Sequence, residues 1–244
     1  MWCLLPILIF LSPTSFLSGC GISTHTEIGF RALEFLGSSE DSDAQFVRSI
    51  LLKHPDAFQA GHPYPDSFYN SLCYHGDYHG QSEDTHWGQF VKVAFDFVNE
   101  KYPVPWDEDT EKLVAFLFGI ISHQVADISW HGLEGLSDGF LPVLGKLGFH
   151  GSFGTAHDFG DVADDMIGVF EWNVTSYATE WYVPVQDLME IYDAYYGGNN
   201  ELTADIVDVC AGMLLVGRVG EQVAGRILYY EYAKRSPIML DIFR

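Results

Sequence analysis

A long apolar segment that carries three polar residues at fixed spacing constrains the fold most. The sequence HQVADISWH, residues 123–131, places Asp127 four residues after His123 and four residues before His131. On a helix that advances about 100° per residue, these three side chains fall within an arc of roughly 80°. One face of a predicted core helix, residues 109–130, therefore presents two imidazoles and a carboxylate.

The same four-residue spacing recurs in His157 and Asp161 on the next long predicted helix. Zinc takes His nitrogen and Asp oxygen at about 2.0–2.2 Å, and ligands one helical turn apart can converge on one ion or on two neighbours. A single pair of this kind is more often a surface or hydrogen-bonded pair. Two such pairs, one of them extended by a further His inside an apolar segment, favour a metal site.

Helix patterns dominate the rest of the chain, and strand patterns are weak. A capping box, Thr24-x-x-Glu27, predicts the start of the first helix. The region 57–83 is rich in Gly, Pro, Tyr and His, and it predicts a long folded loop. The sequence predicts an all-α single domain. The other predicted helices cover residues 43–52, 85–100, 155–180, 185–196 and 203–232.

The net charge of the chain restricts the molecules that it can bind. The chain has 244 residues and a formal net charge of -22, so its field repels nucleic acid and anionic bilayers. An anionic substrate must therefore be captured locally, and bound cations can do so.

Residues 1–19 predict a secretory signal peptide cleaved after Gly19, because an apolar run is followed by Pro, Ser and small residues. A membrane anchor is the alternative, but the run is too short to span a bilayer. Asn173-Val174-Thr175 is a potential glycosylation acceptor. Cleavage leaves three cysteines, so at most one disulfide forms within the chain; Cys73 with Cys210 is one pairing, which leaves Cys20 free.

Five segments carry a resemblance to a known family: CGISTHTEIGFRALEFL, AGHPYPDSFY, THWGQF, PWDEDTEKLVAFLFGIISHQVADISWH and FHGSFGTAHDFGDV. Over residues 20–196 the chain resembles the N-terminal catalytic domain of the glycosylphosphatidylinositol-specific phospholipase D family. That family is similar to zinc-dependent phospholipase C and to single-strand-specific nucleases, which are helical and hold up to three zinc ions. The resemblance implies a zinc-dependent phospholipase C-like domain at residues 20–244.

The resemblance also implies a ligand set. The amine and carbonyl of a mature N-terminal Cys20 would ligate zinc, and Asp66 would be both a ligand and a base. Asp127 would bridge two zinc ions, and His86 would be a loop ligand with His79 as its alternative. The remaining implied ligands are His25, His123, His131, His157 and Asp161.

Two departures from the family pattern accompany this set. Asp127 and His131 are four residues apart, where the wider superfamily usually has six. The family enzyme continues into a β-propeller that this sequence lacks, and the tail after about residue 197 is expected to be divergent or truncated.

The predicted function is a secreted, extracellular zinc phosphodiesterase that hydrolyses glycosylphosphatidylinositol anchors and gives phosphatidic acid. Its partners would be these anchors and a membrane surface, without nucleic acid and without a transmembrane segment in the mature chain. A phospholipase C-type enzyme and a catalytically silent, truncated binding domain are the alternatives. Four aromatic residues near the proposed ligands would line a lipid-facing mouth or belong to the core: Tyr64, Phe68, Tyr69 and Trp87. The non-ligand histidines His54, His62, His75 and His150 are expected to tolerate replacement better than the ligands.

Overall fold

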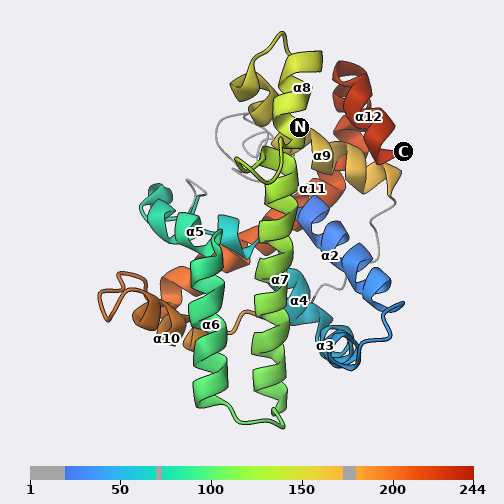
Figure 1. Ribbon diagram of the computed structural model, residues 1–244. Helices are drawn as coiled ribbons and strands as arrows, with labels where there is room; N and C mark the ends of the chain where they lie inside the picture. The colour runs from blue at the N-terminus through green and yellow to red at the C-terminus, as the bar shows by residue number, and fades with distance from the viewer. Residues whose placement is uncertain (1–19, 70–72, 173–179) are drawn as a thin grey trace, which may run out of the picture.

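The computed structural model describes residues 20–69, 73–172 and 180–244, and these form an all-α fold as predicted (Figure 1). Within these ranges, extended pairing is limited to one isolated bridge, between Leu133 and Ser137. The predicted signal peptide and glycosylation site lie outside the described residues. The helices are α2 Ile22–Leu36, α3 Ser42–Lys53, α4 Pro55–Gly61, η1 Tyr64–Asp66, η2 Tyr74–Gly76, α5 His79–Thr85, α6 Gly88–Lys101, α7 Glu108–His131, α8 Phe140–Gly148, α9 Phe153–Glu171, α10 Val185–Tyr195, α11 Ala204–Arg235 and α12 Pro237–Phe243.

Helix α7 runs through the middle of the molecule, with α6 beside it and α8, α9 and α12 gathered at one end (Figure 1). It begins where the Asp107 side chain accepts a hydrogen bond from the Thr110 backbone N–H at 2.9 Å, and acidic residues follow in its first turn. It ends before Gly132, whose φ of 90° suits a residue without a Cβ. The predicted core helix is thus confirmed.

Length and hydropathy alone would also allow α7 to cross a membrane. In this fold, however, α2, α3, α4, α6 and α8 pack around it, and residues along most of its length are buried. These contacts are those of the core helix of a globular domain.

A close contact between α4 and α7 positions the segment that follows α4. Gly61 and Gly119 meet there: a Cβ on Gly61 would lie 2.0 Å from the Phe116 carbonyl oxygen, and one on Gly119 would lie 2.5 Å from the Phe58 carbonyl oxygen. Only glycines allow the two backbones to approach so closely. This contact brings η1, with Asp66, against α7.

Two hydrophobic cores flank the polar stretch of α7. The larger one includes Leu113, Phe116 and Ile120 from the first part of the helix. The smaller one is built from α8, α9, α11 and α12, and Trp130 packs against it. The polar side chains of His123, Asp127 and His131 therefore lie between two apolar regions, which pack against the two ends of the helix.

Several predicted helix boundaries were wrong. Thr24 lies inside α2 and caps nothing, because its backbone N–H and hydroxyl donate to Asp165 of α9. Region 57–83 is folded but is no long loop, since short helices occupy most of its described part. The prediction missed α8 and α12 and continued α9 beyond its end at Glu171.

A disulfide joins Cys73 to Cys210 across 137 residues, and Cys20 remains a buried free thiol. This bond ties the segment between η1 and α5 to α11. We expect Cys210→Ser to lower the free energy of unfolding by about 2–4 kcal/mol, because the unfolded chain regains the entropy of a long loop. Urea unfolding followed by circular dichroism measures this loss. Cys73→Ser should match it, and the double variant should add little; a doubled loss would contradict a shared bond.

Candidate metal centre

His123, Asp127 and His131 lie on one face of α7, as their spacing predicted, and the first of them is fully buried. The Asp127 carboxylate lies 3.3 Å from His123 Nε2 and 3.9 Å from His131 Nε2. Side chains from four other elements or turns converge on this face, and together they form three groups.

The first group joins Asp66, His86, His123 and Asp127. His86 Nε2 lies 3.4 Å from an oxygen of Asp66 and 3.4 Å from an oxygen of Asp127. The Nε2 atoms of His86 and His123 are 3.0 Å apart. Asp66 comes from the turn after α4 and is buried, whereas His86 follows α5 directly.

Hydrogen bonds to carbonyl groups fix how these two imidazoles face the centre. Nδ1 of His123 donates to the backbone carbonyl of His62 at 2.7 Å, and Nδ1 of His86 donates to that of Ser82 at 2.8 Å. Because a carbonyl only accepts, each neutral ring carries its lone pair on Nε2, which is the atom that faces the group. Two nitrogen atoms 3.0 Å apart repel each other if both direct lone pairs at the gap, so a proton or a metal cation must lie between them.

The carboxylates make this group attractive to a cation. Burial alone would lower the pKa of His86, but the carboxylates of Asp66 and Asp127 outweigh it and raise the pKa to about 9. Burial also opposes ionisation of Asp127, yet the nearby imidazoles of His123 and His25 hold its pKa well below the usual range. Asp127 is therefore a carboxylate, the form that binds metal.

The second group joins His131, His157 and Asp161. His157 Nδ1 lies 3.1 Å from an oxygen of Asp161, and the rings of His131 and His157 are 5.0 Å apart. Trp130 donates from its indole N–H to the other oxygen of Asp161 at 2.9 Å and so orients this carboxyl group. Burial lowers the pKa of His131 to about 4, which keeps this imidazole neutral and able to bind metal at neutral pH.

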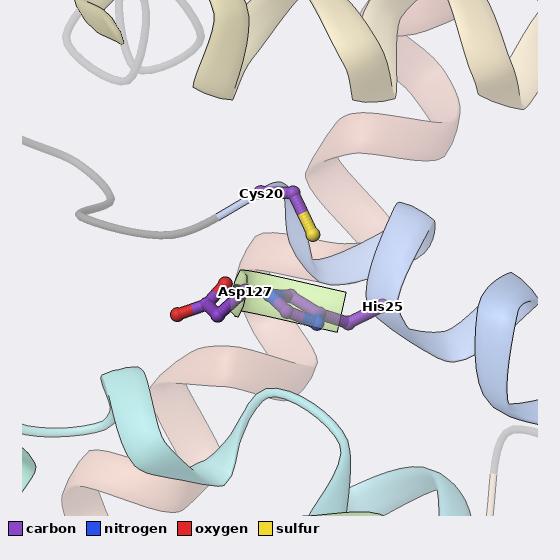
Figure 2. A group of neighbouring side chains, drawn as sticks. All are labelled: Cys20, His25 and Asp127. Carbon is purple, nitrogen blue, oxygen red and sulfur yellow. Dashed lines mark ion pairs between the residues drawn. The ribbon is translucent and has the colours of Figure 1, made fainter. Parts of the chain in front are cut away.

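The third group joins Cys20, His25 and Asp127. Figure 2 shows Cys20 just before α2, with its sulfur directed toward the ring of His25, and the carboxylate of Asp127 beside that ring. His25 Nε2 lies 3.4 Å from Asp127, and the ring stacks on His123 with centroids 3.8 Å apart. Asp127 thus belongs to the first group and to this one.

Two buried acids and one partly buried acid, which the sequence analysis missed, hold the start of α2 in place. Gly21 N–H donates to Asp164 at 2.8 Å, Thr24 N–H donates to Asp165 at 2.8 Å, and the Ser23 hydroxyl donates to Glu221 at 3.1 Å. These contacts position Cys20 and His25. A signal was present in the sequence: Asp164 and Asp165 are adjacent acids inside a predicted helix, directly before the apolar run at residues 166–170.

The donors of the three groups fit zinc. Several of their buried atoms form no hydrogen bond within the described parts of the chain: both ring nitrogens of His25, both oxygens of Asp66, Asp127 Oδ1, His131 Nε2 and Asp161 Oδ2. Buried polar atoms cost free energy unless they are partnered. Imidazole nitrogens and carboxylate oxygens are zinc ligands. Donor atoms lie within 4.8 Å of one another in four sets of three residues: Cys20, His25 and Asp127; His25, Asp66 and His123; His86, His123 and Asp127; and His131, His157 and Asp161.

All nine residues of the predicted ligand set thus lie in these groups. His79, the alternative to His86, is exposed, and its ring meets that of Tyr69 edge to face instead. Of the four aromatic residues, Tyr64 and Phe68 are core residues, whereas Trp87 is half exposed. Tyr69 is partly buried, with its ring centroid 5.5 Å from that of His86.

The non-ligand histidines divide into two kinds. His75 and His150 are exposed, whereas His54 and His62 are buried. His54 pairs with Glu111 at 2.9 Å, and the His62 ring fills the space over Gly29. Replacement of these two should therefore affect folding, although neither belongs to a metal group.

We expect His131→Asn to lower the zinc content of the purified chain by about one ion, because it removes one of three donors from the second group. His150→Asn is the matched control, since His150 is exposed and its φ of 54° is one that asparagine tolerates. Metal analysis by mass spectrometry measures both variants. Equal zinc in the two would remove His131 from the ligand set.

Comparisons with known proteins agree with this chemistry. The family model "Zinc dependent phospholipase C" matches residues 24–217. A rat phosphatidylinositol-glycan-specific phospholipase D is 44% identical over 99% of the chain, and the human protein of that name is 46% identical over 93%. A protein of the same name from Dictyostelium discoideum is 32% identical over the whole chain. The chain spans 25–28% of the length of these curated relatives. No solved structure matches it.

Proposed function

The chain belongs to the zinc-dependent phospholipase C family, and from this premise we propose that it is a zinc-dependent phosphodiesterase that hydrolyses glycosylphosphatidylinositol anchors. The observation that carries the proposal is the convergence of nine donor residues, from separate parts of the sequence, on one end of α7. An accidental cluster of buried imidazoles and carboxylates would be costly, because so many of its atoms lack hydrogen bonds.

Each group would hold one zinc ion. Asp66, His86 and His123 would share the first with Asp127, which would also ligate the ion beside Cys20 and His25. The second group, His131, His157 and Asp161, would hold another. When bound, zinc supplies a Lewis acid that makes water acidic near neutral pH and neutralises the charge on phosphodiester oxygens.

The protein's own groups would deprotonate the attacking water and orient the imidazoles that bind metal. Asp66 is buried, and neither of its oxygens has a hydrogen-bond partner in the described structure, so it can accept a proton from a water placed beside it. The His62 and Ser82 carbonyls hold His123 and His86 in their metal-binding tautomers. Substrate would approach past His131 and His157, whose side chains are 20% and 26% exposed, the highest values among the ligands that form ion pairs.

The substrate class comes from the relatives. Their names denote phospholipases D specific for phosphatidylinositol-glycan, and their identity to this chain supports the same linkage as its substrate. Hydrolysis of the bond between the phosphate and inositol would transfer the water's hydroxyl group to phosphorus, leave phosphatidic acid and release the inositol-glycan with its protein. A phospholipase C-type cleavage would leave diacylglycerol instead.

The test is to incubate the purified, zinc-loaded chain with a detergent-solubilised anchor and with the same anchor in intact membranes, and to identify the lipid product. Phosphatidic acid from the soluble anchor supports the proposal, and diacylglycerol would reassign the reaction. A folded, zinc-loaded chain that turns over neither anchor, nor a simple chromogenic phosphodiester, would be a silent binding domain.

We further propose that the chain is exported and that its mature form begins at Cys20. Cleavage there would place an α-amine five residues before His25 and beside Asp127, next to the acids that hold residues 21–24. N-terminal sequencing of material secreted from cultured cells should give Cys-Gly-Ile-Ser first. A retained leader, or any other first residue, would contradict this proposal.

A further inference from the structure

Helix α11 is apolar on two opposite faces. One face, with Val207 and Leu214, is buried against the rest of the fold, and Gly217 and Gly225 allow close approach of Ile22 and Val169. The opposite face carries six large apolar side chains that are 46–69% exposed, which we call the α11 stripe: Val209, Val216, Val219, Val223, Ile227 and Tyr230. An apolar face of a helix normally packs against a partner, and this second face has none within the described chain.

The α11 stripe is long, narrow and continuous. At about 100° per residue its six side chains fall within an arc of roughly 80°, and at 1.5 Å per residue it extends about 32 Å. Val209, Val216, Val223 and Tyr230 are spaced by seven residues, the repeat by which one helix packs along another. A single exposed valine is ordinary, but a row of this length marks a docking surface for another helix.

The α11 stripe and the glycines beside it form a self-complementary sequence. Its midpoint lies between Val219 and Gly220, and equal steps from that midpoint reach Val216 and Val223, then Gly212 and Ile227, and then Val209 and Tyr230. If a second α11 lay antiparallel about that midpoint, every residue would face its symmetric counterpart. Three of the four pairs would then set a small side chain against a larger one, as interdigitating helices require.

The glycines of this face leave room for a second helix. A Cβ built on Gly212 or Gly220 would meet nothing within 4 Å, so both open onto free space. Ile227 of one copy can enter the space over Gly212 of the other. Gly220 at the midpoint lets the two backbones approach, as small residues do at helix crossings.

The charged residues near the two ends of α11 favour an antiparallel pair of helices over a parallel pair. Asp205 and Lys234 are exposed, lie at equal steps from the same midpoint, and fall within the angular range of the stripe. An antiparallel pair would place Asp205 of each copy against Lys234 of the other, which makes two ion pairs. A parallel pair would place like charges together.

From this symmetry we propose that two copies of the chain form a homodimer through antiparallel α11 helices. A two-fold axis through the midpoint gives the closed, isologous contact that is the commonest arrangement in soluble oligomers. The opposite face of α11 carries Glu221, which holds Ser23, so the dimer would support the helix on which the start of α2 rests.

The first experiment measures mass by light scattering and sedimentation over a range of protein concentrations. The wild-type chain should be a dimer at micromolar concentration, and Val219→Glu should be a monomer because it places two charges at the axis. Leu147→Glu is the matched control, since Leu147 is an exposed apolar residue on α8, away from α11. Circular dichroism and zinc content check that each variant is folded.

The second experiment tests the pairing itself. Asp205→Lys and Lys234→Glu each turn both end contacts into repulsions and should weaken the homodimer roughly tenfold. A mixture of the two variants should recover wild-type affinity, because each Lys then faces an acid in the other copy. A surface that docks a lipid or another protein would show no such rescue.

Three results would overturn the proposal. The first is a wild-type chain that stays monomeric up to millimolar concentration. The second is a dimer that survives Val219→Glu unchanged, and the third is a mixture that shows no rescue. If a monomeric wild-type chain binds neutral phosphatidylcholine vesicles and Val219→Glu abolishes that binding, the stripe is a lipid contact instead.

Discussion

Removing zinc with a chelator is expected to destabilise the folded chain by about 10 kcal/mol or more, which corresponds to a fall of at least about 20 °C in its thermal midpoint. Without a metal ion, the carboxylates of Asp66 and Asp127 and the imidazoles of His86 and His123 remain crowded together in a largely buried space. This loss should exceed that from breaking the Cys73–Cys210 disulfide. Calorimetry before and after dialysis against chelator measures it.

Two controls make this result specific. Adding back zinc should restore the midpoint, whereas magnesium should not, because the groups are rich in imidazole. Chelator should leave the midpoint of a zinc-free preparation unchanged, which separates metal loss from any direct effect of the chelator. An unaltered midpoint in a chain shown by metal analysis to have lost its zinc would contradict a structural role for the centre.

Asp127→Asn is expected to have the largest effect of any single substitution, with a fall of more than about a hundredfold in phosphodiester hydrolysis. The change keeps the shape of the side chain but removes the negative charge shared by the first and third groups. It also removes the carboxylate that pairs with His25, and it leaves His123 only the carboxylate of Asp66, 4.0 Å from its Nε2. Zinc content should drop in parallel, by up to two ions per chain.

The matched control for that variant is Asp96→Asn. Asp96 is an exposed acid on α6, paired with Lys92 and remote from the ligands in the sequence. Its loss should change neither zinc content nor turnover, since exposed ion pairs contribute little. If Asp127→Asn keeps its zinc and its activity and folds normally, the shared role of Asp127 is wrong.

The part of this centre that lies on α7 and α9 could be predicted from local sequence, because residues four apart must share a helix face. His123 with Asp127, and His157 with Asp161, needed no information from elsewhere in the chain. The assembly of groups from distant segments is different. Asp66, His86 and Cys20 entered the predicted set through resemblance to a family, because spacing alone gives no reason for them to meet α7.

The wrong predictions show which features of the fold local sequence patterns cannot reveal. Thr24 matches a capping box, but its donors are satisfied by Asp165, 141 residues away, and a local pattern cannot detect such a partner. Region 57–83 lacks a helical period because its helices are too short to show one, and the close contact of Gly61 with Gly119 holds it in place. Segment α8 contains three apolar leucines among glycine and proline, so packing rather than propensity makes it helical.

The acids that hold the start of α2 also set the order of events while the protein is made. Ser23 is anchored by Glu221, 198 residues later in the chain, and Gly21 by Asp164, 143 residues later. A ribosome must therefore have made the chain as far as Glu221 before all the contacts that hold the start of α2 can form. The residues of the first and second groups all precede Asp164 in the sequence, so the third group is the one that can take up zinc only after α11 has been made.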